Sequence, residues 1–290
     1  MNDRETGRFK GMIDLNYRVC LMLPDQNPHA ACFREIALLL ISALKSHGLH
    51  CDFSTNALAP DRTNILLGYH LLTFEEGLKN FRYIPYQLEQ LNSKEFPFSS
   101  NMEAILRHAT MVWDYSEKNI DFLNSLGIQA KLLVPGYHEN LETIPDIPDS
   151  DRPIDILFYG SIGERRKKIL DELANICNVK VLFGVYGEKR DEWIRRSKII
   201  LNINHYSQHI FEAVRVSYLL NNRCLVVSEA PEEYCYPFVS IPIVSYEHLT
   251  DTCRILLKYP EELDMHRRTT HFEFKTYYPM SELIEKVLND

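Results

Sequence analysis

The chain has 290 residues, of which 45% are hydrophobic and 25% are charged, and its formal net charge is −8. This composition is typical of a globular protein and argues against a disordered or fibrous chain. The length is sufficient for two ordinary domains. Because the net charge is negative, no general basic field attracts nucleic acid or anionic membranes, and an anion-binding site must be built locally.

Three features bear on the cellular compartment. The seven cysteines include no C-x-x-C pair, which predicts reduced thiols in a reducing compartment. The polar stretch at residues 1–16 lacks the hydrophobic region of a signal peptide. The longest apolar run, residues 36–44, is too short to span a bilayer and belongs to an amphipathic pattern. We therefore expect a cytoplasmic protein.

The first half of the chain alternates strand and helix patterns. Tyr17–Leu23 predicts a buried strand, and apolar residues at helical spacing from Phe33 to Leu44 predict a helix that Gly48 ends. Further strands are expected at 51–55, 64–70, 110–116 and 130–136, and further helices at 101–109 and 116–127, with Ser116 as a cap. This alternation is typical of a parallel α/β sheet.

A second cycle follows a Pro- and Asp-rich stretch at residues 142–155, which we interpret as a linker. Strands are expected at 154–160, 179–187, 198–206, 225–229 and 240–246, and helices at 161–176, 188–197, 209–221, 247–260 and 280–290. The sequence thus predicts an α/β protein with two Rossmann-like domains facing a cleft, at residues 1–145 and 146–290. Ligands of such sheets bind at the carboxyl ends of the strands.

The stretch ILFYGSIGERRKK is a candidate phosphate site. A strand ends at Gly160, and Ser161 belongs to a turn of small residues that feeds a basic helix. Free N–H groups at a helix start attract phosphate, and small residues let it approach. Arg165, Arg166 and Lys168 would add charge-assisted hydrogen bonds. The alternative is a solvated basic helix face, because neither G-x-G-x-x-G nor the P-loop pattern is present.

Two later strand ends also carry polar or aromatic residues. Tyr186 and Gly187 follow one strand, where Tyr186 could stack on a base or be an ordinary loop aromatic. His205 and Tyr206 follow the next strand, in the run NHYSQH. Because a helix comes directly after this run, we expect these side chains at a ligand-binding edge of the sheet.

Glu212 and Arg215 lie one turn apart near the start of the helix that follows. Glu212 could accept hydrogen bonds from sugar or ribose hydroxyls, and Arg215 could keep it ionised or meet a diphosphate. The alternative is an ion pair that serves stability alone. In the first half, His29 follows the first strand and could act as a general base, although a loop histidine is often only a surface residue.

No metal site is expected. The pair Asp149 and Asp151 has the spacing of metal-binding carboxylates but lies in the linker. The eleven histidines show no H-E-x-x-H or similar ligand spacing.

The order of these parts resembles GT-B glycosyltransferases, particularly bacterial group 1 (family 4-like) enzymes and their spore-maturation-type relatives. The resemblance is clearest from Ile154 to Glu229, where FYGSIGERRKK matches the loop beside the diphosphate and LLNNRCLVVSE matches the G-x-P-V-V strand region. KLLVPGYHEN is similar to the strand that leaves the acceptor-binding half. The resemblance implies an N-terminal acceptor-binding domain, a C-terminal nucleotide-sugar-binding domain, and a last helix that crosses back to the first.

The resemblance also implies the activity of a hexosyltransferase-like enzyme. It would transfer a sugar from a nucleotide-sugar to an acceptor hydroxyl without a metal, and the nucleotide-sugar is a co-substrate rather than a cofactor. Glu212, His29 and Arg165 would be catalytic. The donor-binding residues would be Gly160, Ser161, Arg166, Lys168, Tyr186, Gly187, His205, Tyr206 and Arg215. A glycan, a lipid-linked compound or a small molecule would be the acceptor, not nucleic acid. Peripheral membrane contact and the oligomeric state are left open.

One departure from the family pattern keeps other functions open. The family commonly shows two glutamates eight positions apart, whereas Leu220 stands eight positions after Glu212. This departure supports a first alternative, a GT-B-like protein that binds a nucleotide or sugar without turnover and acts as a regulator or partner subunit. A second alternative is a nucleotide-sugar epimerase or another nucleotide-dependent α/β enzyme.

Overall fold

The computed structural model describes residues 16–24, 28–74, 76–206 and 209–289. Ser207 and Gln208, which belong to the run NHYSQH, lie outside these ranges, as does the N-terminal stretch. The described chain divides into two compact α/β units. Unit 1 holds the described residues up to Leu91, Pro97–Pro135 and the residues from Met280 on, and unit 2 holds Asn92–Phe96 and Gly136–Pro279.

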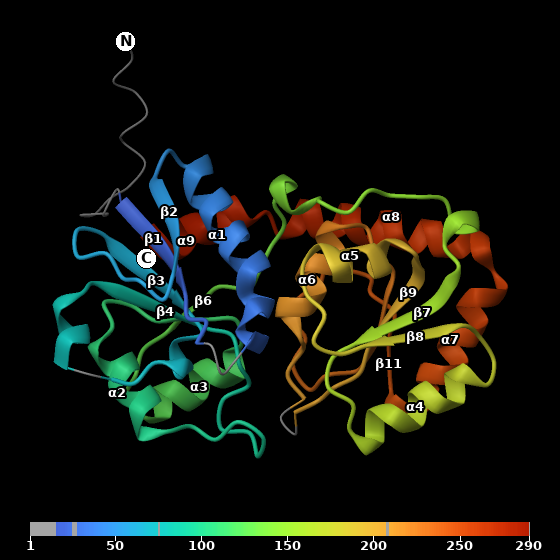
Figure 1. The fold of residues 1–290 in the computed structure, drawn as a ribbon, viewed down its shortest axis with the longest axis horizontal. Helices are drawn as coiled ribbons and strands as arrows, with labels where there is room; N and C mark the ends of the chain where they lie inside the picture. The colour runs from blue at the N-terminus through green and yellow to red at the C-terminus, as the bar shows by residue number, and fades with distance from the viewer. Residues whose placement is uncertain (1–15, 25–27, 75, 207–208, 290) are drawn as a thin grey trace, which may run out of the picture. The chain divides into compact units, whose positions relative to one another are not determined.

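Unit 1 is built on a parallel sheet with the strand order β2-β1-β3-β4-β5-β6 (Figure 1). Its strands are β1 (Asn16–Leu21), β2 (His50–Thr55), β3 (Thr63–Leu67), β4 (Tyr83–Gln87), β5 (Trp113–Asp114) and β6 (Lys131–Leu132). Its helices are α1 (Arg34–Ser46), α2 (Ser100–His108), α3 (Glu117–Ser125) and α9 (Met280–Asn289). The last helix therefore belongs to unit 1, where it packs on α1.

Several local expectations for unit 1 are confirmed. Helix α1 buries its apolar face, including Ile36 and Leu40. The hydroxyl of Ser116 accepts a hydrogen bond from the backbone N–H of Asn119 at 3.2 Å and caps α3. The ring Nε2 of His47, in the turn after α1, lies 2.7 Å from the carbonyl oxygen of Ser281 in α9. That contact helps to fix α9 against α1.

Strand β4 was not predicted, because proline is unfavourable inside a sheet and β4 contains Pro85. The carbonyl of Tyr83 accepts a hydrogen bond from Thr110 on the side of β5. By the alternation of backbone groups along a strand, Pro85 faces the same side. The ladder between β4 and β5 begins only at Tyr86, so the missing N–H of Pro85 costs no sheet hydrogen bond.

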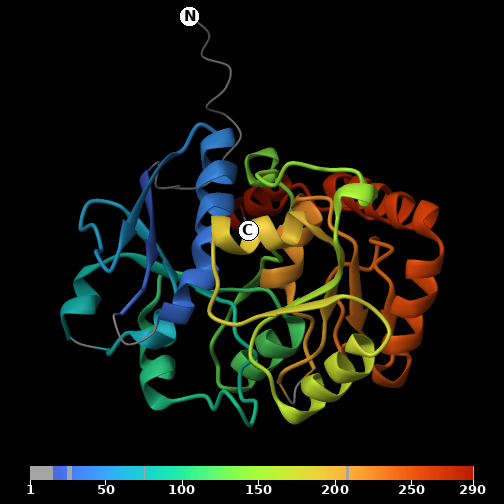
Figure 2. The same cartoon turned by 45° about the vertical axis from the view of Figure 1, so that its right-hand side comes forward.

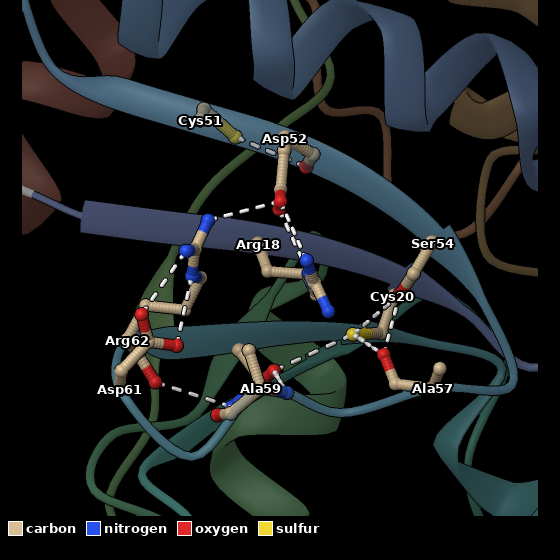
Figure 3. Close-up of polar contacts among 10 residues, drawn as sticks. Arg18, Cys20, Cys51, Asp52, Ser54, Ala57, Ala59, Asp61 and Arg62 are labelled. Carbon is tan, nitrogen blue, oxygen red and sulfur yellow. Dashed lines mark hydrogen bonds and ion pairs between the residues drawn. The ribbon is translucent and has the colours of Figure 1, made fainter.

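Strand β2 forms one edge of the unit 1 sheet and carries an ion-pair network (Figure 3). Asp52 accepts two hydrogen bonds from Arg18, at 2.8 and 2.6 Å, and one from Arg62 at 2.9 Å. On β1, burial raises the pKa of the Cys20 thiol to about 11. Charged side chains on an edge strand discourage pairing with another chain.

Unit 2 is built on a second parallel sheet, with the strand order β11-β10-β9-β7-β8 (Figures 1 and 2). Its strands are β7 (Ile154–Tyr159), β8 (Val179–Leu182), β9 (Ser197–Asn202), β10 (Val226–Glu229) and β11 (Ile243–Val244). Its helices are α4 (Glu164–Ala174), α5 (Glu188–Arg195), α6 (Ala213–Asn221), α7 (Leu249–Lys258) and α8 (Pro260–Tyr277). The core under α4 and α7 includes Phe158, Leu173 and Cys253.

The stretch interpreted as a linker, residues 142–155, is part of unit 2. Arg152 is buried and donates hydrogen bonds to the carbonyl of Arg195 at 2.8 Å and to the carboxylate of Asp146 at 2.7 Å. Arg267 of α8 reaches the carboxylate of Asp149.

Within the described residues, no helix is long and apolar enough to cross a membrane.

Candidate functional site

The site in unit 2 is centred on Gly160, directly after β7. Its φ of +138° lies in a region that favours glycine. A Cβ atom at this position would lie 3.0 Å from Nη2 of Arg215 and 3.6 Å from Nη1 of Arg166. Two guanidinium groups therefore approach the backbone at the end of β7, and a Cβ atom there would crowd that of Arg215 and touch that of Arg166.

Arg166, in the first turn of α4, contacts several segments of this site and is only 3% exposed. Its guanidinium donates to the carbonyl of Ile203 at 3.0 and 2.5 Å and to the carbonyl of Ser161 at 3.0 Å. It also donates to Oε1 of Glu212 at 2.9 Å. A buried charge requires such partners. Arg166 thus ties the loop after β7 to the end of β9 and to the start of α6.

Glu212 immediately precedes α6 and forms an ion pair with a second arginine, Arg215. Nη1 of Arg215 lies 3.0 Å from Oε2 of Glu212 and donates to Oδ1 of Asn202 at 3.2 Å. The Arg215 guanidinium lies over the ring of Tyr159, 5.2 Å from its centroid. Glu212 is 12% exposed and Arg215 is 18% exposed. The two residues that the sequence marks one turn apart therefore face the strand ends.

The immediate cluster carries two positive charges and one negative charge. Arg190 adds a third guanidinium, 5.9 Å from the ring of Tyr159, and is itself paired with Asp191 at 2.7 Å. The start of α4 contributes backbone N–H groups next to Gly160. Such an arrangement can bind a polyanionic group, because unbalanced guanidinium charge and helix-start donors act together.

Arg165, the neighbour of Arg166, extends in another direction. It forms a bidentate ion pair with Glu229 at the end of β10, and one of the two bonds measures 2.6 Å. Its guanidinium lies 4.0 Å from the ring centroid of Tyr246, whose hydroxyl donates to the carbonyl of Arg165 at 2.7 Å. The backbone N–H of Asn204 also donates to Glu229, at 3.0 Å.

His205 and Tyr206 follow β9 beside this cluster. Their rings are in edge contact, with centroids 5.1 Å apart. Desolvation lowers the pKa of His205 below its ordinary 6.5, and the cation of Arg166 lowers it further. His205 is therefore neutral at pH 7, so its ring has one donor and one acceptor nitrogen for a ligand.

The remaining predicted residues lie outside the contacts described above. Lys168 is exposed on the outer face of α4, where it lines a separate hollow of about 400 Å³. Gly187 precedes α5 with a φ of +58°, and Tyr186 is half-buried in the loop before it. His29 is exposed in a 3-10 turn (Pro28–Phe33) of unit 1. Among the described residues, no cluster of three or more His, Cys, Asp or Glu could hold a metal ion.

Several residues of the site were absent from the predicted set: Tyr159, Arg190, Asn202 and Glu229. Most of them lie at the last position of a strand or just beyond it. A systematic reading of polar or aromatic residues at strand ends, which identified the run from Asn204 on, would also have found Tyr159, Asn202 and Glu229. Arg190, on a helix among other charged residues, gave no such signal.

Sequence comparisons find two similar proteins. No family model matches the chain. Two uncharacterized proteins of Acanthamoeba polyphaga mimivirus are similar, at 26% identity over 159 residues and 23% identity over 218 residues. These alignments cover 52% and 72% of this chain but 21% and 20% of the relatives. The chain thus spans about a fifth of the length of the curated relatives it matches.

Solved structures are similar over most of the chain. An α-glucosyltransferase in complex with UDP and a DNA 13-mer matches with a TM-score of 0.58 at 8% identity, over 94% of this chain and 99% of that one. A variant of S. aureus TarM in complex with fondaparinux, α-GlcNAc-glycerol and UDP gives 0.56 at 13% identity, over 80% and 55%. An α1,3-fucosyltransferase with GDP-fucose gives 0.51 at 12% identity, over 97% and 92%. The chain has the GT-B fold. Its two parallel sheets are the two Rossmann-like domains of that fold.

Proposed function

We propose that the chain is a glycosyltransferase that binds a nucleotide-sugar in unit 2 and transfers the sugar to an acceptor hydroxyl. The observation that carries this proposal is the cluster of Arg166, Glu212 and Arg215 against Gly160, at the carboxyl edge of the unit 2 sheet. Neighbouring solved structures contain UDP or GDP-fucose, which are ligands of the proposed type.

In this proposal the cluster stabilises the leaving diphosphate. Arg215 is partly exposed and is the guanidinium of the cluster best placed to reach a ligand, whereas the buried Arg166 holds the site together. Negative charge develops on the diphosphate as the glycosidic bond breaks, and preorganised cations stabilise that charge. Cationic side chains and the start of α4 would perform this task without a metal. Both carboxylate oxygens of Glu212 bind arginine, so we assign it to positioning these cations.

A thermal-shift panel of UDP-, GDP-, ADP-, CMP- and dTDP-sugars, with the free nucleotides, tests the proposal. A ligand at 100 times its dissociation constant stabilises the fold by about 2.7 kcal/mol. We expect one nucleotide series to stabilise the protein and the effect to shrink in Arg215→Ala. Arg268→Ala is the matched control, because Arg268 is 76% exposed on α8. No stabilisation by any member of the panel would contradict nucleotide binding.

A second candidate function is nucleotide-sugar binding without turnover. It is favoured by the lack of a second glutamate eight positions after Glu212, where Leu220 stands, and by the complete engagement of Glu212 with two arginines. Incubation with the donor found in the panel separates the two functions. Transfer of the sugar to an added glycan, lipid-linked or small-molecule acceptor supports the transferase, whereas binding with no transfer and no hydrolysis supports the binding protein. An epimerised sugar in the absence of an acceptor would indicate the epimerase.

A further inference from the structure

Beside the proposed diphosphate site, the ends of β9 and β10 hold hydrogen-bond acceptors that are buried. Asn204 is 4% exposed, and the Glu229 side chain is 5% exposed. Oδ1 of Asn204 is buried and has no hydrogen-bond partner among the described residues. Leaving a buried acceptor without a partner is costly, so its presence at a sheet edge points to a ligand that donates hydrogen bonds.

The orientation of the Asn204 amide is fixed by its other contact. Nδ2 donates to the carbonyl of Ala230 at 3.2 Å. The opposite orientation would place two carbonyl oxygens against each other, so the atom without a partner is the oxygen. The backbone N–H of Asn204 donates to Oε2 of Glu229 at 3.0 Å, which places the two residues side by side at the ends of β9 and β10.

Arg165 covers this surface. Its guanidinium forms the bidentate pair with Glu229 while remaining 41% exposed, so it lies between the buried carboxylate and solvent. Tyr246 contacts both parts of this residue, because its hydroxyl donates to the Arg165 carbonyl and its ring lies 4.0 Å from the guanidinium. The carboxylate of Glu229 is buried, so a ligand that displaces the guanidinium must replace its hydrogen bonds to both carboxylate oxygens.

We propose that Glu229 and Asn204 form a subsite for the ribose hydroxyls of the nucleotide, which Arg165 covers until the ligand binds. This inference rests on the proposed function. Adjacent hydroxyls supply the two donors that a carboxylate and an amide oxygen accept, and a carboxylate at a strand end is a known ribose partner in Rossmann-like sheets. The ring of Tyr246 lies next to Arg165, and it offers a face for the base attached to that ribose.

In this scheme Arg165 leaves the Glu229 carboxylate and binds a phosphate group of the ligand. It belongs to the first turn of α4, the helix start that the proposed function assigns to the diphosphate. When ribose hydroxyls replace the guanidinium on Glu229, the guanidinium becomes available to a phosphate oxygen. The same side chain therefore opposes nucleoside binding and favours nucleoside diphosphate binding.

The test measures dissociation constants by calorimetry for UDP and GDP, and then for the 2′-deoxy and 3′-deoxy forms of whichever binds. We expect the deoxy forms to bind wild type roughly tenfold or more weakly, because a buried acceptor is left unpaired. In Glu229→Ala, and in the isosteric Glu229→Gln, the difference should shrink, to within about twofold in the alanine variant. Glu172→Gln, an exposed change on α4, is the control and should keep the wild-type ratio.

Arg165→Ala tests the exchange. We expect it to keep the ribose discrimination, to bind the unphosphorylated nucleoside more tightly than wild type, and to bind the diphosphate more weakly. Circular dichroism and thermal melting establish that each variant is folded. Equal discrimination in wild type and both Glu229 variants would overturn the subsite while leaving nucleotide binding intact. If wild type shows no ribose discrimination, and Glu229→Ala weakens only the nucleotide-sugar, the hydroxyls belong to the transferred sugar and the ribose assignment is overturned. No binding of any nucleotide would overturn both proposals.

Discussion

Arg215 lies so close to the backbone of Gly160 that a single added carbon atom would crowd its guanidinium. The ideal Cβ position at Gly160 is 3.0 Å from Nη2 of Arg215, and the φ of +138° is a conformation that other residues rarely adopt. The glycine therefore serves two purposes: it permits the turn after β7 and leaves space for the guanidinium. The conformation of the loop and the position of the Arg215 guanidinium therefore both depend on this glycine.

Gly160→Ala should lower the free energy of unfolding by about 1–3 kcal/mol, the usual cost of backbone strain, and should weaken nucleotide binding by moving Arg215. The matched control is Gly163→Ala, because Gly163 has an ordinary φ of −97° and nothing within 4 Å of its ideal Cβ. Urea denaturation and calorimetric titration measure the two effects. If both alanine variants behave alike, Gly160 has no special part in the site.

How far the sequence predicts the fold depends on whether burial coincides with apolar residues. Helix α1 was predicted because its buried face is apolar at helical spacing. Helix α8 was not, because its buried residues include Arg267, Thr270 and His271, which hide the periodicity. Arg267 is paired with Asp149, and His271 contacts the carbonyl of Leu220 at 2.9 Å. Partners distant in the sequence make those burials favourable, and a local pattern does not contain them.

The candidate site shows the same limit. Arg165, Arg166 and Lys168 are equivalent basic residues in the sequence, and the helix pattern alone does not separate their roles. The structure sends Arg166 into the site, Arg165 to Glu229 and Lys168 to the outer face of α4. The prediction that polar residues gather at the strand ends needed only the α/β order. The assignment of individual contacts needed the tertiary structure.

Glu212→Gln should destabilise the protein by about 2–4 kcal/mol, because it leaves the buried Arg166 and the partly buried Arg215 without a counter-ion. Glutamine keeps the size of the side chain and one acceptor oxygen, so the loss reports mainly the charge. The control is Asp264→Asn, which removes the carboxylate of a surface pair with Arg268 and should change stability by less than about 0.5 kcal/mol. Chemical denaturation of both variants measures the difference. A neutral Glu212→Gln would show that the cluster does not depend on this charge.

His70 makes stability depend on pH. Burial lowers its pKa from 6.5 to about 4. As the pH falls below 6.5, His70 binds a proton in the unfolded chain but not in the folded chain. The free energy of unfolding therefore decreases between pH 6.5 and pH 4. From pH 7 to pH 5 this loss amounts to about 2 kcal/mol. Denaturation curves at several pH values should show a shallower dependence in His70→Gln than in wild type.

The control for that measurement is His50→Gln, because His50 is exposed at the start of β2. It should leave the pH dependence of stability at the wild-type slope. A slope in His70→Gln equal to that of wild type would mean that His70 titrates normally in the folded protein.

Asn64 should be among the most sensitive polar positions of unit 1. It is fully buried, and its Oδ1 accepts the N–H of Ala59, which Figure 3 labels, at 2.8 Å. Its Nδ2 donates to the carbonyls of Ala59 at 2.8 Å and Arg82 at 3.0 Å. Asn64→Leu has a similar volume but leaves backbone groups of Ala59 without partners. We expect a loss of roughly 3 kcal/mol.

The same substitution at Asn178 provides the comparison, because this exposed residue donates to the carbonyl of Pro153 at 2.8 Å. Water replaces the lost partner there, so Asn178→Leu should cost less than about 1 kcal/mol. Thermal melts followed by circular dichroism rank the two variants. Equal losses would mean that water reaches the Ala59 backbone as readily as it reaches Pro153, and that Asn64 does not hold the loop between β2 and β3 in place.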